Sequence, residues 1–309
     1  MISLEGKDII SAKQFSREEL EYIINWAIKI EQDKEIYSNS LKGTIMATLF
    51  YEPSTRTRLS FESAMSRLGG SVIGFSSSSV SSAQKGETLA DTIRTVSQYS
   101  DLIVLRHPND GAATFAARCS NIPVINAGSG TGEHPTQSLL DLLTIQQECG
   151  KVDGLNIGLI GDLKFGRTVH SLAYLLANYD VNLYLISPPS LKMQNRVMDY
   201  LQGKENVKTV QTTKFIETLP NLDVIYMTRV QKERFPDPEE YELVKDVFKF
   251  EKELLPKLKP NAKIMHPLPR VNEISPDIDD NPHAIYFKQT YYGLMLRKAL
   301  IGLIMGSFK

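Results

Sequence analysis

The alternation of short aliphatic runs with amphipathic helical patterns limits the fold of this chain more than any other feature. The runs with the length and aliphatic character of strands are residues 44–50, 71–75, 102–106, 123–126, 156–161, 181–187, 222–227 and 263–265. Between them, apolar residues recur at helical spacing, for example in residues 61–68 and 88–99. Strands that alternate with helices are typical of parallel sheets covered by helices. The pattern therefore predicts an α/β protein.

The strand-like runs fall into two series, separated by a turn-rich stretch at residues 128–132 and a helical pattern at residues 136–149. The 309 residues also exceed the roughly 250–300 residues at which a single hydrophobic core stops growing. We therefore predict two doubly wound domains, each with a central parallel sheet flanked by helices. Residues 76–82 and 231–240 are longer than plain connections require and are expected to be loops.

The overall charge excludes several classes of partner. The chain has 35 basic and 36 acidic residues, so it lacks the global positive field that holds proteins on nucleic acid or on anionic membranes. Its 2 cysteines are too few for a disulfide framework, and its 5 histidines show no metal-ligand spacing. We predict no metal, no cofactor, and neither a nucleic acid nor a membrane as partner. Residues 1–11 lack the apolar core of a signal peptide, so a cytoplasmic location is expected.

The segment Ser54-Thr55-Arg56-Thr57-Arg58 is the most informative chemical feature. It follows a predicted strand and opens a helical pattern, which is the local geometry that binds phosphate through free backbone N–H groups and the helix dipole. Its hydroxyl groups add donors, and an arginine adds a bidentate charge. A plain helix cap would need only one hydroxyl. The segment therefore predicts an anion site.

A second glycine-containing segment leaves an alternative open. Gly161 and Gly166 are separated by four residues and lie between a predicted strand and a helical pattern, as in a P-loop. However, Arg167 occupies the position of the essential lysine. From these residues alone, a nucleotide-binding kinase or ATPase is the runner-up.

Taken together, the motifs of this chain resemble those of the aspartate/ornithine carbamoyltransferase family, whose carbamoyl phosphate signature is Ser-Thr-Arg-Thr-Arg. The further matching segments, in the family order, are residues 85–88, 106–108, 134–137, 161–168, 229–231 and 266–270. The resemblance covers nearly the entire chain. The ornithine-specific branch has His-Cys-Leu-Pro where residues 266–269 read His-Pro-Leu-Pro, which favours aspartate as the acceptor.

This resemblance implies an activity. The family's aspartate branch has a catalytic chain that converts carbamoyl phosphate and L-aspartate into N-carbamoyl-L-aspartate and phosphate, the second step of de novo pyrimidine (UMP) biosynthesis. The resemblance also implies a homotrimer with shared active sites, and it leaves open whether regulatory chains join it. A non-catalytic subunit that keeps the fold is a further alternative, although every family position is filled by the expected residue type.

The resemblance also assigns domains and site residues. Residues 1–133 with the C-terminal helix 290–309 would form a carbamoyl phosphate-binding domain, and residues 134–289 an aspartate-binding domain. The implied catalytic residues are Arg56, Thr57, Arg106 and His134. Carbamoyl phosphate would be bound by Ser54, Thr55, Arg56, Thr57, Arg106, His134, Gln137, Leu268 and Pro269. Aspartate would be bound by Lys85, Arg167, Arg229 and Gln231. The adjacent chain would contribute Ser81 and Lys85.

Overall fold

The computed structural model describes residues 2–77, 82–230, 238–244 and 247–308. The chain divides into two compact units: Met1–Leu140 with Thr290–Lys309, and Asp141–Gln289. Both divisions fall inside helices, α6 (Pro135–Cys149) and α11 (Tyr286–Ile304). Each unit is built on one parallel sheet, so the predicted α/β class with two doubly wound sheets is confirmed.

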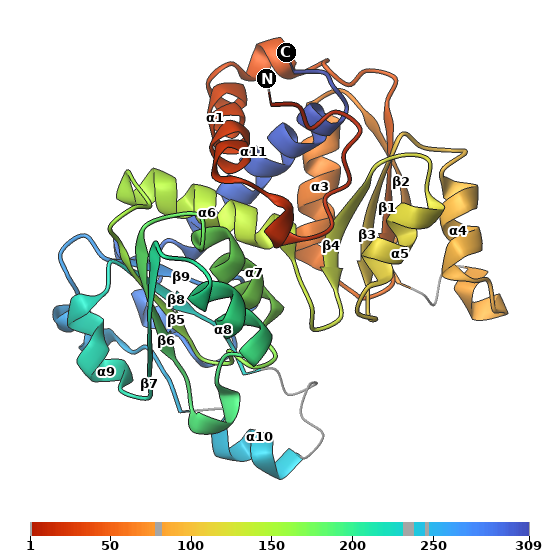
Figure 1. The fold of residues 1–309 in the computed structure, drawn as a ribbon. Coiled ribbons are helices and arrows are strands. Elements are labelled where there is room, and N and C mark those ends of the chain that lie inside the picture. Colours follow the sequence, from red (N-terminus) through yellow and green to blue (C-terminus); the bar gives the residue numbers. More distant parts are fainter. Residues whose placement is uncertain (1, 78–81, 231–237, 245–246, 309) are drawn as a thin grey trace. The chain divides into compact units, whose positions relative to one another are not determined.

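The first unit contains a four-stranded sheet in the order β2-β1-β3-β4. Its strands are β1 (Ile45–Phe50), β2 (Ser71–Phe75), β3 (Leu102–His107) and β4 (Val124–Ser129), all parallel. Its helices before α6 are α1 (Arg17–Gln32), α2 (Lys34–Tyr37), α3 (Thr55–Arg67), α4 (Leu89–Val96) and α5 (Ala112–Cys119). Helix α3 covers one face of this sheet, and α4 and α5 cover the other (Figure 1). Because both faces are covered, the central strands are almost entirely buried.

The ends of the first unit are tied together by side chains. Helix α1 begins at a capping box, in which the Ser16 hydroxyl accepts from the Glu19 N–H and the Glu19 carboxylate accepts from the Ser16 N–H. The C-terminal part of α11 packs on α1, since Lys298 Nζ lies 2.6 Å from Glu31 Oε2. The ring of Phe308 stacks on Trp26 at a centroid distance of 5.2 Å. Residues 290–308 are therefore part of the first unit's core.

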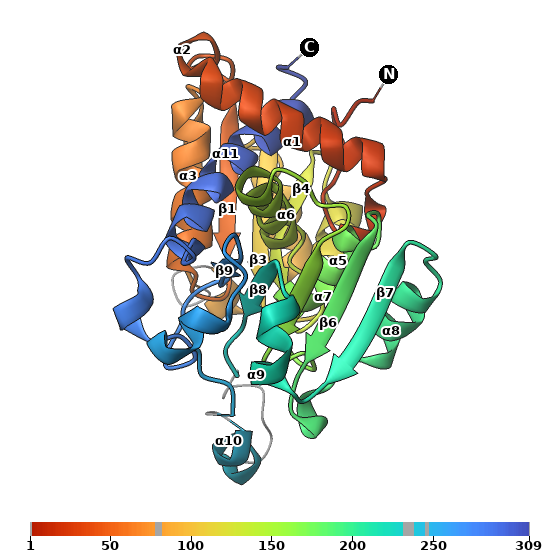
Figure 2. The ribbon, with the colours of Figure 1, turned by 90° about the vertical axis from the view of Figure 1, so that its left-hand side faces the viewer.

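The second unit contains a five-stranded sheet in the order β7-β6-β5-β8-β9. Its strands are β5 (Asn156–Ile160), β6 (Val181–Ile186), β7 (Val207–Thr212), β8 (Val224–Met227) and β9 (Lys263–Met265), all parallel. Its helices between α6 and α11 are α7 (Arg167–Leu176), α8 (Asn195–Gln202), α9 (Phe215–Thr218) and α10 (Pro238–Val244). Figure 2 shows β7 at the outer edge of the sheet, next to β6.

Two details differ from the sequence prediction. Strand β7 was not predicted, and α10 begins at Pro238, inside the stretch expected to be a loop. Residues 78–81 and 231–237 of the two expected loops lie outside the described residues. Within the described ranges, no helix is long and apolar enough to cross a membrane.

Candidate active site

The first sheet has a topological switch point between β1 and β3. From β1 the chain moves to β2 on one side and then returns to β3 on the other. In open α/β sheets, ligands bind beyond the carboxyl ends of the strands at such a point. Segment 54–57 follows β1, and Arg106 is the second-last residue of β3, where it pairs with Phe50 of β1. The structure therefore brings both predicted anion-binding elements to one edge of the first sheet.

The phosphate-type segment has the local geometry expected from the sequence. Ser54 is the N-cap of α3 with extended backbone, and its side chain makes no capping hydrogen bond. Thr55 and Arg56 are exposed at the helix N-terminus, whereas Thr57 is buried. The next arginine, Arg58, forms an ion pair with Glu62 one turn later at 2.9 Å. The cap of α3 therefore does not use the Ser54 hydroxyl, which leaves this group available for a ligand.

Arg106 is held in place from two directions. Its Nη1 donates to the Ala127 carbonyl of β4 at 3.4 Å, and its Nε lies 3.5 Å from Glu52 Oε2. Glu52 follows β1, so this contact joins the two strand ends that flank the switch point. Sequence reasoning missed Glu52, because a single acidic residue before Pro53 carries no pattern of its own.

His134 and Gln137 lie beyond the neighbouring strand β4. The chain turns after Ser129, whose N–H donates to the Glu133 carbonyl at 3.2 Å. Helix α6 then starts at Pro135, a residue suited to the first helical position because it has no N–H to satisfy. His134 and Gln137 are both buried at this helix start. The carboxyl ends of β1, β3 and β4 thus carry all the predicted site residues between 54 and 137 except Ser81 and Lys85.

The second sheet has its own switch point between β5 and β8. From β5 the chain moves outward through β6 and β7, then crosses back to β8 and β9. Arg167 is the first residue of α7 after β5, and Arg229 lies two residues beyond β8. Both side chains are partly buried. The two arginines predicted to bind a dicarboxylate therefore follow neighbouring strands at the same sheet edge.

The glycine-containing loop between β5 and α7 is not arranged as a P-loop. In a P-loop, backbone N–H groups point at the phosphates. Here the N–H groups of Lys164 and Phe165 donate to Asp162 Oδ1 at 3.1 and 2.8 Å. Asp162 is fully buried, so an internal carboxylate occupies these donors. This arrangement argues against the nucleotide-binding alternative.

Gly161 allows the ends of β5 and β8 to lie close together. It has a φ of 117°, and a Cβ atom at this position would lie 2.3 Å from the Thr228 carbonyl oxygen, directly before Arg229. We expect Gly161→Ala to lower the free energy of unfolding by about 1–3 kcal/mol, because the methyl group meets backbone that cannot move aside. Denaturant unfolding measures this loss. Gly150→Ala is the matched control, since Gly150 has a φ of 74° and nothing within 4 Å of an added Cβ. Equal losses in the two variants would contradict the close approach.

The remaining predicted residues have separate positions. Leu268 and Pro269 lie in the turn after β9, which neighbours β8, and the peptide bond between them is cis. Lys85 ends a 3-10 helix (Ser82–Lys85) in the first unit and is exposed. Ser81 and Gln231 lie outside the described residues. Within the part of the chain that the structure describes, no group of three or more His, Cys, Asp or Glu side chains is arranged to hold a metal ion.

Comparison with known proteins decides the family. A family model described as the carbamoyl-P binding domain of aspartate/ornithine carbamoyltransferase matches residues 7–147. A second, described as the Asp/Orn binding domain of the same enzymes, matches residues 153–304. The chain belongs to the aspartate/ornithine carbamoyltransferase family. The resemblance expected from the sequence motifs is therefore confirmed.

Carbamoyltransferases of the aspartate branch are similar to this chain over its whole length. The aspartate carbamoyltransferase catalytic subunit of Thermococcus onnurineus is 56% identical over 98% of both chains. That of Methanocella arvoryzae is 52% identical over 99% of both chains. Among solved structures, aspartate transcarbamoylase from Trypanosoma cruzi with carbamoyl phosphate and aspartate has a TM-score of 0.94 at 43% identity, covering 98% of both chains. The same enzyme has also been solved with N-(phosphonacetyl)-L-aspartic acid, with a TM-score of 0.93.

Proposed function

We propose that this carbamoyltransferase chain is a catalytic subunit that transfers the carbamoyl group of carbamoyl phosphate to L-aspartate. The products are N-carbamoyl-L-aspartate and phosphate, as in the second step of de novo pyrimidine biosynthesis. The amine of aspartate attacks the carbonyl carbon, a C–N bond forms, and the bond from this carbon to the phosphate oxygen breaks. The amine loses a proton in the process. No covalent bond to the protein is required, so the chain has to orient two anions and stabilise one oxyanion.

The residues of the first unit suit carbamoyl phosphate. Ser54, Thr55, Arg56 and Thr57 receive the phosphate at the N-terminus of α3, where backbone N–H groups and the helix dipole favour an anion. Arg106 and His134, with Thr57, polarise the carbonyl oxygen. Gln137 accepts from the carbamoyl NH2 group. The support for these roles is the common position of their strand ends at the carboxyl edge of one sheet.

The residues of the second unit suit a dicarboxylate. Arg167 and Arg229 each offer a guanidinium fork that can pair with one carboxylate of aspartate. Ornithine would present an ammonium group to the same arginines and be repelled. Gln231 adds a neutral donor, and the carbonyl groups of Leu268 and Pro269 accept from the substrate amines. The observation that carries the proposal is this pairing of a phosphate-type set and a dicarboxylate-type set, each at the switch point of its own sheet.

The assembly and the domain functions belong to the same proposal. The unit Met1–Leu140 with Thr290–Lys309 serves as the carbamoyl phosphate-binding domain, and the unit Asp141–Gln289 serves as the aspartate-binding domain. The boundary expected from the sequence, between residues 133 and 134, lies close to this division. The chain forms a cytoplasmic homotrimer in which Ser81 and Lys85 enter the site of the neighbouring chain. The description of the relatives as catalytic subunits fits a trimer that can also bind regulatory chains.

An assay of the purified protein tests the reaction directly. With carbamoyl phosphate and L-aspartate, and without ATP, we expect N-carbamoyl-L-aspartate and phosphate to form in equal amounts. With L-ornithine in place of aspartate, no citrulline should form. Phosphate release without carbamoyl aspartate would contradict the proposal, and citrulline would assign the chain to the ornithine branch. Binding of both substrates without turnover would favour the non-catalytic alternative.

A further inference from the structure

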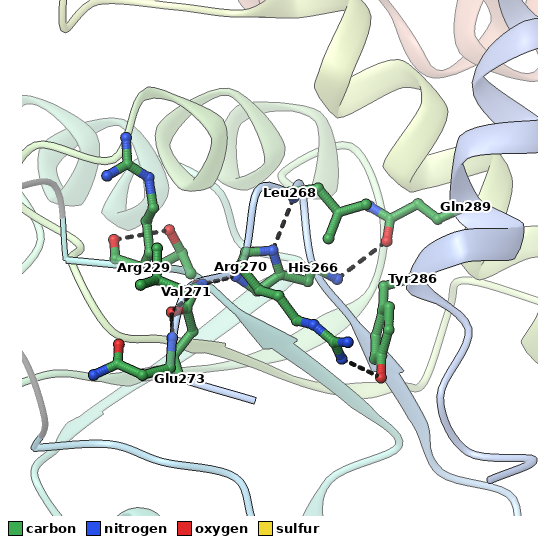
Figure 3. Close-up of polar contacts among 10 residues, drawn as sticks. Arg229, His266, Leu268, Arg270, Val271, Glu273, Tyr286 and Gln289 are labelled. Carbon is green, nitrogen blue, oxygen red and sulfur yellow. Dashed lines mark hydrogen bonds and ion pairs between the residues drawn. The ribbon is translucent and has the colours of Figure 1, made fainter. Parts of the chain in front are cut away.

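The turn that follows β9 is closed on itself by two buried residues, His266 at its start and Glu273 at its end. Their exposed fractions are 1% and 4%. Between them, Leu268 has a φ of 55°, in the left-handed region that a residue with a branched side chain rarely adopts. Such a conformation persists only where the surrounding contacts enforce it. Figure 3 shows the hydrogen bonds that surround this turn.

The hydrogen bonds of His266 define its protonation state. The Leu268 N–H donates to His266 Nδ1 at 2.8 Å. A backbone N–H can only donate, so Nδ1 carries no proton and the ring is the neutral Nε2–H tautomer. Nε2 then donates to Glu273 Oε1 at 2.7 Å. The ring therefore links the Glu273 carboxylate to the backbone of Leu268.

The Glu273 carboxylate is fully used as an acceptor. Its Oε2 accepts from the N–H groups of Val271 and Asn272 at 3.0 and 3.1 Å, while Oε1 faces His266. Burial by itself would raise the pKa of this carboxyl, but the hydrogen bonds from His266 and the Val271 N–H lower it below its ordinary value. The group is therefore a carboxylate at neutral pH.

A second chain of hydrogen bonds fixes the start of the turn. The His266 N–H donates to Gln289 Oε1 at 3.1 Å, and Gln289 Nε2 donates to Asp141 Oδ1 at 2.6 Å. Tyr226 Oη donates to Asp141 Oδ2 at 2.8 Å. These residues are almost fully buried and come from α11, α6 and β8. Within the turn, the ring and the carboxylate then hold the peptide N–H groups of Leu268, Val271 and Asn272.

We propose that Glu273 is a positioning residue for carbamoyl transfer, acting through the Nε2–H tautomer of His266 to aim the carbonyl groups of Leu268 and Pro269. This inference rests on the proposed function, in which those carbonyl groups accept from the substrate amines. Phosphate and carboxylates are held by other residues, so a misdirected turn impairs the orientation of the reacting amines rather than substrate binding. The expected signature is a lower kcat with little change in KM.

Glu273→Gln tests the assignment because an amide cannot replace this carboxylate in either orientation. If its NH2 group faces the N–H groups of Val271 and Asn272, donors face donors and both hydrogen bonds to these N–H groups are lost. If the NH2 group faces His266, Nε2 must become an acceptor and the ring proton moves to Nδ1, where it meets the Leu268 N–H. We expect kcat to fall about 10- to 100-fold, in line with small displacements of positioned groups. KM for both substrates should change less than about threefold, because uniform binding is unaffected.

N-(phosphonacetyl)-L-aspartate separates positioning from simple damage. This compound carries the phosphonate and both carboxylates, lacks the carbamoyl NH2 group, and keeps the aspartate nitrogen only as an amide N–H, so most of its binding does not depend on the turn. Glu273→Gln should therefore bind it with nearly wild-type affinity and a full number of sites. An unchanged kcat in Glu273→Gln would overturn the inference. A loss of kcat matched by an equal loss of binding sites would also overturn it.

The control variant makes the same chemical change at the opposite edge of the sheet. Asp223 precedes β8, and its two oxygens accept from the Asn156 N–H at 2.8 Å and from Lys259 Nζ at 2.6 Å. Asp223→Asn should lower thermal stability and leave kcat unchanged. If Asp223→Asn lowers kcat as much as Glu273→Gln does, the effect is general destabilisation.

Two substitutions of His266 test whether its hydrogen bond to the Leu268 N–H is what orients the turn. His266→Asn keeps an acceptor two residues before Leu268, whereas His266→Gln keeps a donor near Glu273 but loses that acceptor. We expect the asparagine variant to retain the higher kcat. A side chain that only fills space would give the reverse order, because glutamine is closer to histidine in volume.

A measurement that does not depend on activity completes the test. Side-chain ¹⁵N NMR of histidine-labelled protein, with His266 assigned by its absence in His266→Gln, should show a proton on Nε2 and none on Nδ1. A proton on Nδ1 would overturn the inference even if the enzyme is active. Failure of the wild-type protein to form carbamoyl aspartate would instead overturn the proposed function.

Discussion

Alanine at position 229 is expected to lower kcat/KM for aspartate by about 30- to 5,000-fold. The range corresponds to about 2–5 kcal/mol, the usual cost of removing one partner of a partly desolvated charge pair. Arg229 follows β8 at the switch point and is partly buried, so a carboxylate bound there would lose a guanidinium that water replaces poorly. Carbamoyl phosphate binding should change little. Steady-state kinetics with each substrate varied in turn provide the measurement.

Two further variants sharpen the result for Arg229. Arg229→Lys keeps the charge but not the planar fork, and should recover only part of the activity. Arg196→Ala removes an exposed arginine from α8 of the same unit and should have wild-type kinetics. An unchanged aspartate kcat/KM in Arg229→Ala would show that this residue does not bind the acceptor.

Mixed trimers of Arg56→Ala and Lys85→Ala chains are expected to regain about a quarter of wild-type activity, although each variant alone is nearly inactive. The proposal places Arg56 in the site of its own chain and Lys85 in the site of the neighbour. In a random mixture of equal parts, a native site needs a Lys85→Ala chain, which supplies Arg56, next to an Arg56→Ala chain, which supplies Lys85. Each position is filled correctly with a probability of about one half. Activity is measured after the two variants are dissociated together and reassembled.

A complementary mixture distinguishes shared from unshared sites by a second ratio. Chains carrying both substitutions are mixed with equal parts of wild type. Shared sites should then give about a quarter of the activity of pure wild type, because both neighbours must be native, whereas unshared sites should give about one half. If hybrid trimers are present by native mass spectrometry and the single-variant mixture stays inactive, Lys85 acts within its own chain.

The strands of both sheets could be predicted wherever the sequence has an aliphatic run, including the edge strand β2, which has no buried residue. Strand β7 was missed for a physical reason. It lies at the edge of its sheet, where only Val207 is buried, and its polar residues Lys208, Thr209 and Gln211 interrupt any aliphatic pattern. The capping box at Ser16 and Glu19 was predictable because the signal is local, confined to four neighbouring residues.

The family and its reaction could be predicted because several motifs recur in order, and the assignment of individual site residues stays a prediction. What the sequence could not reveal are contacts between distant residues. Asp141 and Gln289 are 148 residues apart and meet only in the fold. Asp162 stands inside a recognised motif, yet its role in holding the loop N–H groups depends on its burial. The spacing of residues in a motif gives information about residues that are close in sequence, so it cannot reveal contacts that form only in the folded chain.

The division of the chain into units has a consequence for its synthesis on the ribosome. Residues 141–289 are contiguous, so the second unit is complete once its last residue has left the ribosome. The first unit begins with the N-terminus but needs residues 290–308, which place Lys298 beside Glu31 and Phe308 on Trp26. Domains fold as units during synthesis. The first unit is therefore translated first but completes its hydrophobic core last. Apolar surface that residues 290–308 cover in the folded protein stays uncovered while the entire second unit is translated.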